Sequence, residues 1–405
     1  MAAMSESTPL IDTSVKEFNN QPKIQFRRRT TLFKSIIVPL VILIILTVYT
    51  TANLIKVDFS EHEIRGEDGV SLKLPHFLSR PLSVRIYTNN IRFDNVNYPD
   101  KGEKSWTRDR KKQVVNSIDF HTGSLGHANV VCLQEVLYHQ LQDVLEGLNT
   151  NADNEYQKWS FYGIGRDDGE KAGEFSPIFY KRKDWTLLEN ETYWLSETPS
   201  TPSKGWDAVL PRIVTQVTLQ SKINPLVKIN VFNTHFDHKG RLARKKSAQL
   251  IVDKMENYND YPSFLCGDFN TEPSDQPYKV LSGAGFKDSR LSVARDFAYG
   301  EESTFTGFDK ENEITNSIID YVWSPYYTKS IDDDEDEEEG DNVFIGLSNY
   351  FNSEQHKHYK IIIKQFGILH NFFKGFYFSD HRPVVATYEI SRTSLFAEEE
   401  NLRLS

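Results

Sequence analysis

The sequence is poor in cysteine, with two among 405 residues. Two cysteines do not make a disulfide scaffold, and cysteines and histidines do not recur at the spacing of a zinc site. Cys132 and Cys266 each lie inside an apolar run, which favours small core residues on buried strands. A disulfide between them stays open if those strands are neighbours. No internal repeat is present, which argues against a solenoid architecture.

Basic residues are also fewer than acidic residues, and the formal net charge is −10. Eight consecutive acidic residues, Asp332 to Glu339, account for most of that excess and are typical of a disordered segment. Long polyanions bind largely through neutralised phosphates, so an acidic chain is a poor partner for them. The balance disfavours a processive or non-specific nuclease, although a local basic groove would override it.

The N-terminal region contains a long uncharged stretch. Residues 1–34 are polar and end in basic residues, and the 21 residues 35–55 that follow carry no charge. A helix of that length spans about 30 Å, the thickness of a bilayer core. We predict a transmembrane signal-anchor helix at 35–55; a cleaved signal peptide and a buried helix are the alternatives. The positive-inside rule then predicts a cytosolic tail at 1–34 and a lumenal or extracellular remainder.

The rest of the chain divides by composition. We predict a polar linker at 56–80, one catalytic domain at 81–392 and a C-terminal tail at 393–405. Within the domain, residues 324–378 are predicted to be an acidic, partly disordered insertion. Such an insertion can act as a lid, but a solvated excursion is the favoured interpretation.

Polar residues recur at the ends of short apolar runs, where open sheets gather their ligands. Carboxylates and amides suit a hard cation such as Mg²⁺, and imidazoles suit a transferring phosphoryl group. The groups are Asn89-Asn90-Ile91-Arg92, Leu133-Gln134-Glu135, Asn233-Thr234-His235-Phe236-Asp237, Gly267-Asp268-Phe269-Asn270, Ile319-Asp320-Tyr321 and Ser379-Asp380-His381-Arg382-Pro383.

In this order the groups resemble the endonuclease/exonuclease/phosphatase family of metal-dependent phosphoesterases, over roughly Pro81 to Ile390. With the predicted anchor, the chain resembles a membrane-anchored, fungal-type member. The resemblance implies an α/β fold, a two-sheet, four-layer sandwich with one metal site at its top, preceded here by one transmembrane helix. It does not fix the substrate, because this fold serves several phosphoesterase activities.

The resemblance also implies a ligand set for the metal. Glu135 becomes the principal Mg²⁺ ligand, with Asn90 beside it as an amide ligand or water holder. Asp380 joins the shell directly or through water, and Mn²⁺ is an alternative cation. A charge at the end of a buried strand costs free energy unless it is paired or metal-bound, which fits this role for Glu135.

Asp268 and Asn270 are two residues apart on an extended segment, so their side chains point the same way. Taken alone, this pattern is also that of an Asx-turn. The resemblance implies that Asp268 activates the attacking water. It implies that Asn270 binds the phosphate and orients Asp268.

His235 and His381 are the candidate imidazoles for phosphoryl contact or leaving-group protonation. Each needs a carboxylate partner to fix its tautomer. By resemblance Asp320 pairs with His381. Glu174 is the candidate partner of His235, and Glu170 competes with it nearby.

Three arginines could clamp a phosphate, and solvated or paired roles are open for each of them: Arg166, Arg212 and Arg244. Arg212 precedes a predicted strand, and we expect it to bind substrate together with Asn270 and His235. Strand alternation places Asp237 on the face of His235 and His238 on the opposite face.

The sequence therefore predicts a Mg²⁺-dependent hydrolase of phosphate esters, a phosphodiesterase or phosphatase. The acidic balance favours a small molecule or a lipid head group over long nucleic acid. A nuclease for DNA or RNA, built on the same site, is the first alternative. A catalytically inactive, membrane-tethered binding domain is the second, which the presence of Glu135, Asp268 and His381 disfavours.

Overall fold

The computed structural model describes residues 61–65, 71–75, 80–123, 126–150, 152, 158–331 and 358–392. The chain divides into two compact units, Met1–Asp58 and Phe59–Ser405, and every described residue belongs to the second. The predicted tails, the predicted membrane span and the acidic run lie outside the described residues. Among the residues described, no helix has the length and apolar character needed to cross a bilayer.

The first sheet has six strands, and β9 and β10 pair in parallel at its centre. In spatial order its strands are β11 (Lys287–Asp288), β13 (Asp320–Ser324), β10 (Ser263–Asp268), β9 (Lys228–His235), β8 (Ile213–Ser221) and β7 (Trp185–Trp194).

The second sheet has eight strands, and β3 and β4 form its parallel centre. In spatial order they are β12 (Ala298–Gly300), β15 (Tyr359–Ile368), β18 (Val384–Arg392), β3 (Leu82–Asn90), β4 (Ala128–Gln134), β6 (Ile178–Lys181) and β5 (Trp159–Tyr162), with β14 (Thr328–Lys329) also paired to β15.

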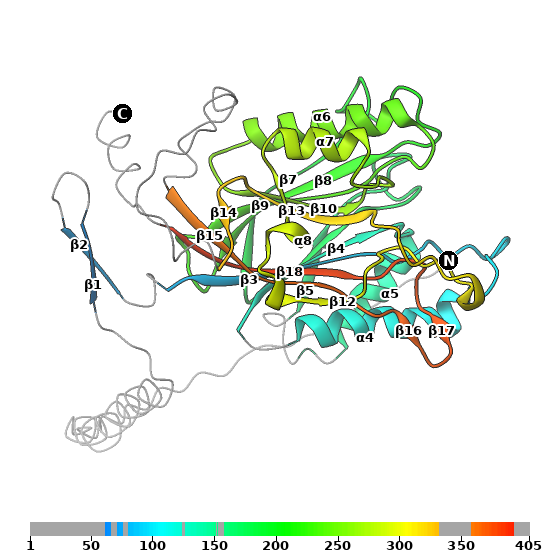
Figure 1. Cartoon of the computed structure of the whole chain (residues 1–405), viewed down its shortest axis with the longest axis horizontal. Helices are drawn as coiled ribbons and strands as arrows, with labels where there is room; N and C mark the ends of the chain where they lie inside the picture. The colour runs from blue at the N-terminus through cyan, green and yellow to red at the C-terminus, as the bar shows by residue number, and fades with distance from the viewer. Residues whose placement is uncertain are drawn as a thin grey trace, which may run out of the picture. The chain divides into compact units, whose positions relative to one another are not determined.

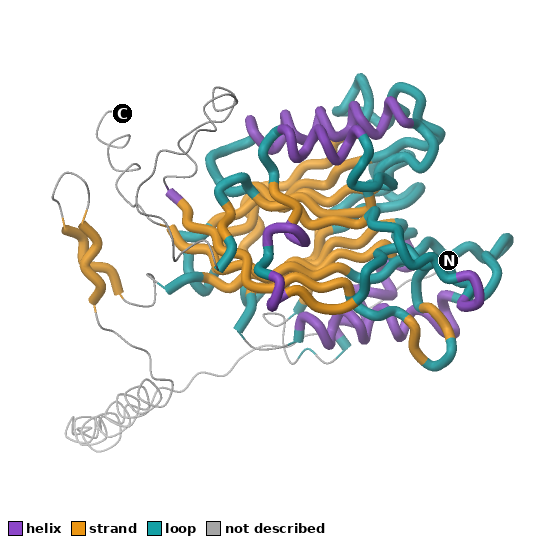
Figure 2. Tube along the Cα trace, in the orientation of Figure 1, coloured by secondary structure: helices purple, strands orange, loops and turns teal. Residues whose placement is uncertain are grey.

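The two sheets lie face to face and helices cover both outer faces (Figure 1; Figure 2). Helices α6 (Arg241–Asn257) and α7 (Gln276–Gly283) pack on the first sheet through a cluster that includes Ile251 and Leu265. Helices α4 (Lys111–Thr122) and α5 (Tyr138–Asn149) pack on the second through Ile118 and Val131. The predicted two-sheet α/β sandwich is confirmed.

Shorter elements complete the described chain. They are the hairpins β1 (Glu61–Arg65) with β2 (Ser71–Pro75) and β16 (Phe372–Phe373) with β17 (Phe376–Tyr377), the π-helical turn η2 (Trp106–Arg110), helix α8 (Ser289–Ser292) and the 3₁₀ turns η3 (Arg295–Phe297) and η4 (Lys310–Asn312). The first hairpin falls within the stretch predicted to be a linker.

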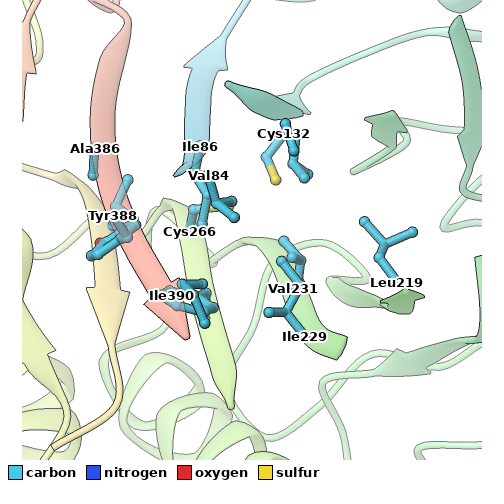
Figure 3. Packing of buried hydrophobic residues seen from close by; sticks show 14 of the residues in the cluster. Val84, Ile86, Cys132, Leu219, Ile229, Val231, Cys266, Ala386, Tyr388 and Ile390 are labelled. Carbon is cyan, nitrogen blue, oxygen red and sulfur yellow. The ribbon is translucent and has the colours of Figure 1, made fainter. Parts of the chain in front are cut away.

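An apolar core fills the space between the sheets (Figure 3). Strand β4 is buried along its whole length, which explains why its sequence is almost continuously apolar rather than alternating. Cys132 on β4 and Cys266 on β10 are both free and buried in this core. They lie on facing sheets rather than on neighbouring strands, and they act as small core residues.

Strand β15 corrects the prediction of an insertion at 324–378. Tyr359–Ile368 pairs with β18 along its length, and Tyr359, Ile361 and Ile363 are buried in the core between the sheets. Part of the predicted insertion is therefore sheet. Lys360, Ile362 and Lys364, which are exposed or partly buried, alternate with the buried Tyr359, Ile361 and Ile363, and this is the period of a half-buried strand. The adjacent acidic run obscured it in the sequence.

A polar contact joins the two sheets at the end where the parallel strands finish. The Gln134 amide of β4 donates to Asn233 Oδ1 of β9 at 2.6 Å. Asn233 Nδ2 donates in turn to the carbonyls of Leu133 and Pro177, at 2.9 Å each. We call this group the inter-sheet amide pair. Because all its polar groups are buried, their mutual hydrogen bonds fix the register of one sheet on the other.

Candidate active site

The predicted polar groups meet at one edge of the sandwich. Strands β3, β4, β9 and β10 end there, and the antiparallel strands β13 and β18 begin there. In the first sheet, Asp268 pairs with His235 on one side and with Asp320 on the other. Sheet register therefore brings residues from distant parts of the chain together.

Asn90 lies at the centre of the group. Its Nδ2 donates to Glu135 Oε1 at 3.0 Å and to Asp268 Oδ2 at 2.9 Å. Its Oδ1 accepts the Arg92 N–H at 2.9 Å. One amide thus links a carboxylate of the second sheet to a carboxylate of the first.

Backbone strain gathers at this edge. Five described non-glycine residues have positive φ, and three of them, Arg92, Glu135 and Asn270, line the same cavity. Such conformations persist only when surrounding contacts hold them, and they cluster at functional sites. Gly267 adds a close approach, since a Cβ there would lie 2.0 Å from the Thr234 carbonyl oxygen. Only glycine therefore lets β10 approach β9 so closely beside Asp268.

His381 and Asp320 form a buried pair. The His381 Nδ1 lies 2.9 Å and 3.1 Å from the two carboxylate oxygens of Asp320. Burial alone would lower the pKa of His381, but Asp320 and Asp268 outweigh it and raise that pKa to about 10. His381 is therefore a cation at neutral pH, with Nε2 directed toward Asp268 Oδ2 at 3.7 Å.

His235 has the opposite character. Burial, together with the neighbouring Arg212 guanidinium, lowers its pKa to about 3, so the ring is neutral. Its Nε2 lies 3.3 Å from Asp268 Oδ2, and its Nδ1 lies 3.6 Å from Glu174 Oε2, beyond hydrogen-bond range. Glu174 instead accepts a hydrogen bond from Arg166 at 2.7 Å. The two imidazoles therefore differ in charge.

Asn270 fixes the orientation of its neighbours. Its backbone N–H donates to Asp268 Oδ1 at 2.9 Å. Its Nδ2 donates to the Phe236 carbonyl and lies 3.0 Å from His235 Nε2. Both carboxylate oxygens of Asp268 are thus engaged, one by Asn90 and one by Asn270, and the carboxylate has a defined direction.

The site has an excess of buried negative charge. Burial and the nearby Glu135 carboxylate raise the pKa of Asp380 to about 6, although His381 and Arg92 act to lower it. Two described groups have ligand atoms within 4.8 Å of one another: Glu135, His235 and Asp268, and Asp268, Asp320 and His381. A divalent cation fits this carboxylate-rich set, because it would compensate Glu135 and Asp380.

A cavity of about 380 Å³ opens over these residues. Arg212 lines it, is 5% exposed and has two guanidinium nitrogens without a hydrogen-bond partner. Its Nη2 lies 3.4 Å from His238 Nδ1, and its Nη1 lies 3.7 Å from Glu174. Its Nε lies 3.8 Å from Asp237, so two carboxylates flank the guanidinium beyond hydrogen-bond distance. A guanidinium in the cavity lining suits an anionic group that enters the cavity.

Two residues that follow His235 differ from the expectation of strand alternation. Asp237 accepts the N–H groups of Val209, Leu210, Lys239 and Gly240, so its carboxylate holds loops together. His238, which strand alternation placed on the opposite face, lines the cavity because β9 ends at His235.

Two aromatic lining residues had no sequence signal pointing to the site. Phe305 packs on the His381 ring with centroids 4.9 Å apart, and Phe93 lines the cavity beside Arg92. Of the remaining candidates, Glu170 donates its backbone N–H to Asp168 Oδ1 and Arg244 donates to the Asp237 carbonyl.

A sequence model of the Endonuclease/Exonuclease/phosphatase family matches residues 90–381, more than half of the chain. The chain belongs to this family. Like other members of the endonuclease/exonuclease/phosphatase family, it is a metal-dependent phosphoesterase, a hydrolase.

Solved relatives share the architecture. The family protein of Bacteroides vulgatus is 30% identical with a TM-score of 0.60, over 76% of this chain and 99% of that chain. A mannosyl-6-phosphatase of Bacteroides thetaiotaomicron is 29% identical with a TM-score of 0.59, over 75% of this chain and 98% of that one.

Another relative is named for a different activity. A probable RNA exonuclease of Schizosaccharomyces pombe is 24% identical over 215 residues, which cover 50% of this chain. This chain spans 39% of that protein's length.

Proposed function

We propose that this chain is a Mg²⁺-dependent hydrolase of phosphate esters of small molecules or lipid head groups. The observation that carries the proposal is the Asp268 carboxylate, held between a neutral and a cationic imidazole by Asn90 and Asn270. A fixed carboxylate in a cavity is suited to orienting and deprotonating a water.

The residues then have distinct roles. Asp268 takes the proton of the water that attacks phosphorus in line. Asn270 and neutral His235 contact the phosphoryl oxygens, and the Arg212 guanidinium, which lines the cavity, binds the same anionic group. Cationic His381, held by Asp320, donates a proton to the departing oxygen. These contacts strengthen as charge develops in the transition state.

Glu135, Asn90 and Asp380 would hold the cation. Of the two groups of converging ligand atoms, only the one with Glu135, His235 and Asp268 shares a residue with this set, and in the other Asp320 and His381 Nδ1 already bond to each other. A bound divalent cation neutralises charge on the phosphoryl oxygens. The oxygen-rich donors favour Mg²⁺, with Mn²⁺ as the alternative.

The mannosyl-6-phosphatase similarity supports a small phosphate ester. Glu135, Glu174, Asp380 and Asp100 also line the cavity, which disfavours a long polyanion. The probable RNA exonuclease relative supports a nuclease as the second candidate. We further propose a membrane-anchored, fungal-type enzyme, for which residues 35–55 and the Schizosaccharomyces pombe relative are the support.

A substrate panel tests the proposal. The purified protein is assayed on sugar phosphates, inositol phosphates, lipid head groups, nucleotides and RNA, each with Mg²⁺ or with EDTA. We expect hydrolysis of at least one small ester that vanishes in EDTA and returns with Mg²⁺ or Mn²⁺. Full activity after exhaustive chelation would exclude the metal assignment, and activity on RNA alone would select the second candidate.

A further inference from the structure

Arg110 is a buried arginine that the proposed reaction does not use. It ends η2, and its side chain has no exposed surface. The guanidinium donates to the carbonyls of Ile91 at 2.8 Å, Phe93 at 3.3 Å and Phe378 at 3.3 Å. Glu103 Oε1, 3.3 Å from Nη2, is its charge partner. This buried cation joins two segments that are far apart in the sequence.

Both segments carry the oxygens proposed to bind the cation. The Ile91 carbonyl belongs to the residue that follows Asn90, and the Phe378 carbonyl lies two residues before Asp380. The Phe93 N–H donates to Glu135 Oε2 at 3.1 Å. Arg110 therefore bonds to the backbone beside each proposed ligand.

The first of these segments needs such support. Arg92, between the two bonded carbonyls, has a φ of 57°, in the left-handed region that a non-glycine side chain rarely adopts. The Arg92 carbonyl also accepts from Arg110, at 3.3 Å. Arg110 thus bonds to three consecutive carbonyls of a strained turn.

Arg110 cannot reach a substrate. It has no exposed surface and is not among the residues that line the cavity. Any effect on the reaction must therefore pass through the groups it holds.

We propose that Arg110 is a positioning residue that fixes Asn90, Glu135 and Asp380 relative to one another and so sets the affinity for the divalent cation. The inference rests on the proposed cation site. Groups that orient metal ligands typically change metal affinity by about 10–100-fold when they are removed.

The test is the Arg110→Lys variant, which keeps the positive charge. It replaces the planar guanidinium by a single ammonium group, which cannot hold several carbonyls in a fixed geometry. Mg²⁺ binding to the full-length protein is measured calorimetrically without substrate. We expect the Kd to rise by about tenfold. We expect kcat at saturating Mg²⁺ to stay within about threefold of wild type.

Arg85→Lys is the matched control. Arg85 also bridges elements, donating to Thr387 Oγ1 at 3.0 Å and to the His121 carbonyl at 3.1 Å, but it contacts no proposed ligand. We expect it to lower the melting temperature without changing the Mg²⁺ Kd.

An unchanged Kd in folded Arg110→Lys would overturn the inference, whereas a wild type that binds no Mg²⁺ would overturn the cation site itself. If Arg110→Lys does not fold, Glu103→Gln takes its place, since it weakens the hold on the guanidinium while leaving the carbonyl bonds. There we expect the Mg²⁺ Kd to rise by less than the about tenfold expected for Arg110→Lys. An unchanged value would again overturn the inference.

Discussion

Asp268 lies between the two histidines and the two asparagines of the proposed site. It pairs with His235 and Asp320 through the sheet, and its carboxylate bonds to Asn90 and Asn270. Its carboxylate lies close to both imidazoles. A change confined to its charge should therefore affect the reaction strongly and the fold weakly.

We expect Asp268→Asn to lower kcat by about 10²–10⁴, because the amide cannot take a proton from water. The amide keeps the shape and an accepting oxygen, so the melting temperature should stay near wild type. Steady-state kinetics and calorimetry measure the two effects. Asp288→Asn is the control, since Asp288 is a buried aspartate outside the cavity and should retain kcat. Retention of more than half of kcat in Asp268→Asn would remove Asp268 as the base.

The His381–Asp320 pair predicts a pH dependence of stability. The folded-state pKa of His381, about 10, lies above its ordinary value of 6.5, so protonation stabilises the folded metal-free protein. This contribution is fully present below about pH 6.5 and is lost as the pH rises through about 10. We therefore expect the free-energy advantage of wild type over His381→Gln, measured by urea unfolding in EDTA, to shrink between pH 7 and pH 10. A constant difference would contradict the pairing.

Much of the site could be predicted from the sequence because its side chains are charged or polar residues in otherwise apolar surroundings. Residues such as Glu135 and Asp268 stand out as charges at the ends of apolar runs, and those runs do end at one edge. Arg110 could not be found this way, because its partners are backbone carbonyls that carry no sequence signal. The Glu174 carboxylate lies near His235 as expected, yet it bonds to Arg166, a choice set by three-dimensional packing.

At the scale of elements, β15 shows where composition misleads. Its period-two pattern was available in the sequence, but an acidic run and an unusually long gap preceded it. The order of strands within each sheet was beyond reach for another reason. Strand pairing depends on partners distant in the chain, as β18 lying between β15 and β3 illustrates.

We expect Ile363→Ala to destabilise the protein by about 2–5 kcal/mol, because Ile363 is fully buried between the sheets and its loss leaves a cavity. Ile362 is the matched control. It is adjacent on β15, points to the opposite face and is only partly buried, so Ile362→Ala should have a clearly smaller effect. Urea unfolding of the two variants measures the difference. Equal losses would mean that β15 does not pack as described.

At the scale of the whole molecule, the proposed anchor at 35–55 predicts a topology. Protease added to sealed microsomes should trim residues 1–34 and leave the catalytic domain protected, because the basic residues precede the apolar stretch. Immunoblotting of the protected fragment, with detergent-opened vesicles as the control, measures this. Digestion of the catalytic domain in sealed vesicles would reverse the orientation.

The inter-sheet amide pair has a consequence for how the enzyme loses activity when the two sheets separate. The second sheet and its flanks supply Asn90, Glu135 and His381, whereas the first supplies His235 and Asp268. Neither sheet carries all of the proposed catalytic and cation-binding residues. A molecule whose two sheets are not docked should therefore have no activity. Each molecule is therefore either active, with its two sheets docked, or inactive. A Gln134→Ala variant, whose docking register is loosened, should show a mixture of fully active and silent molecules rather than a uniformly slowed population, distinguishable by active-site titration.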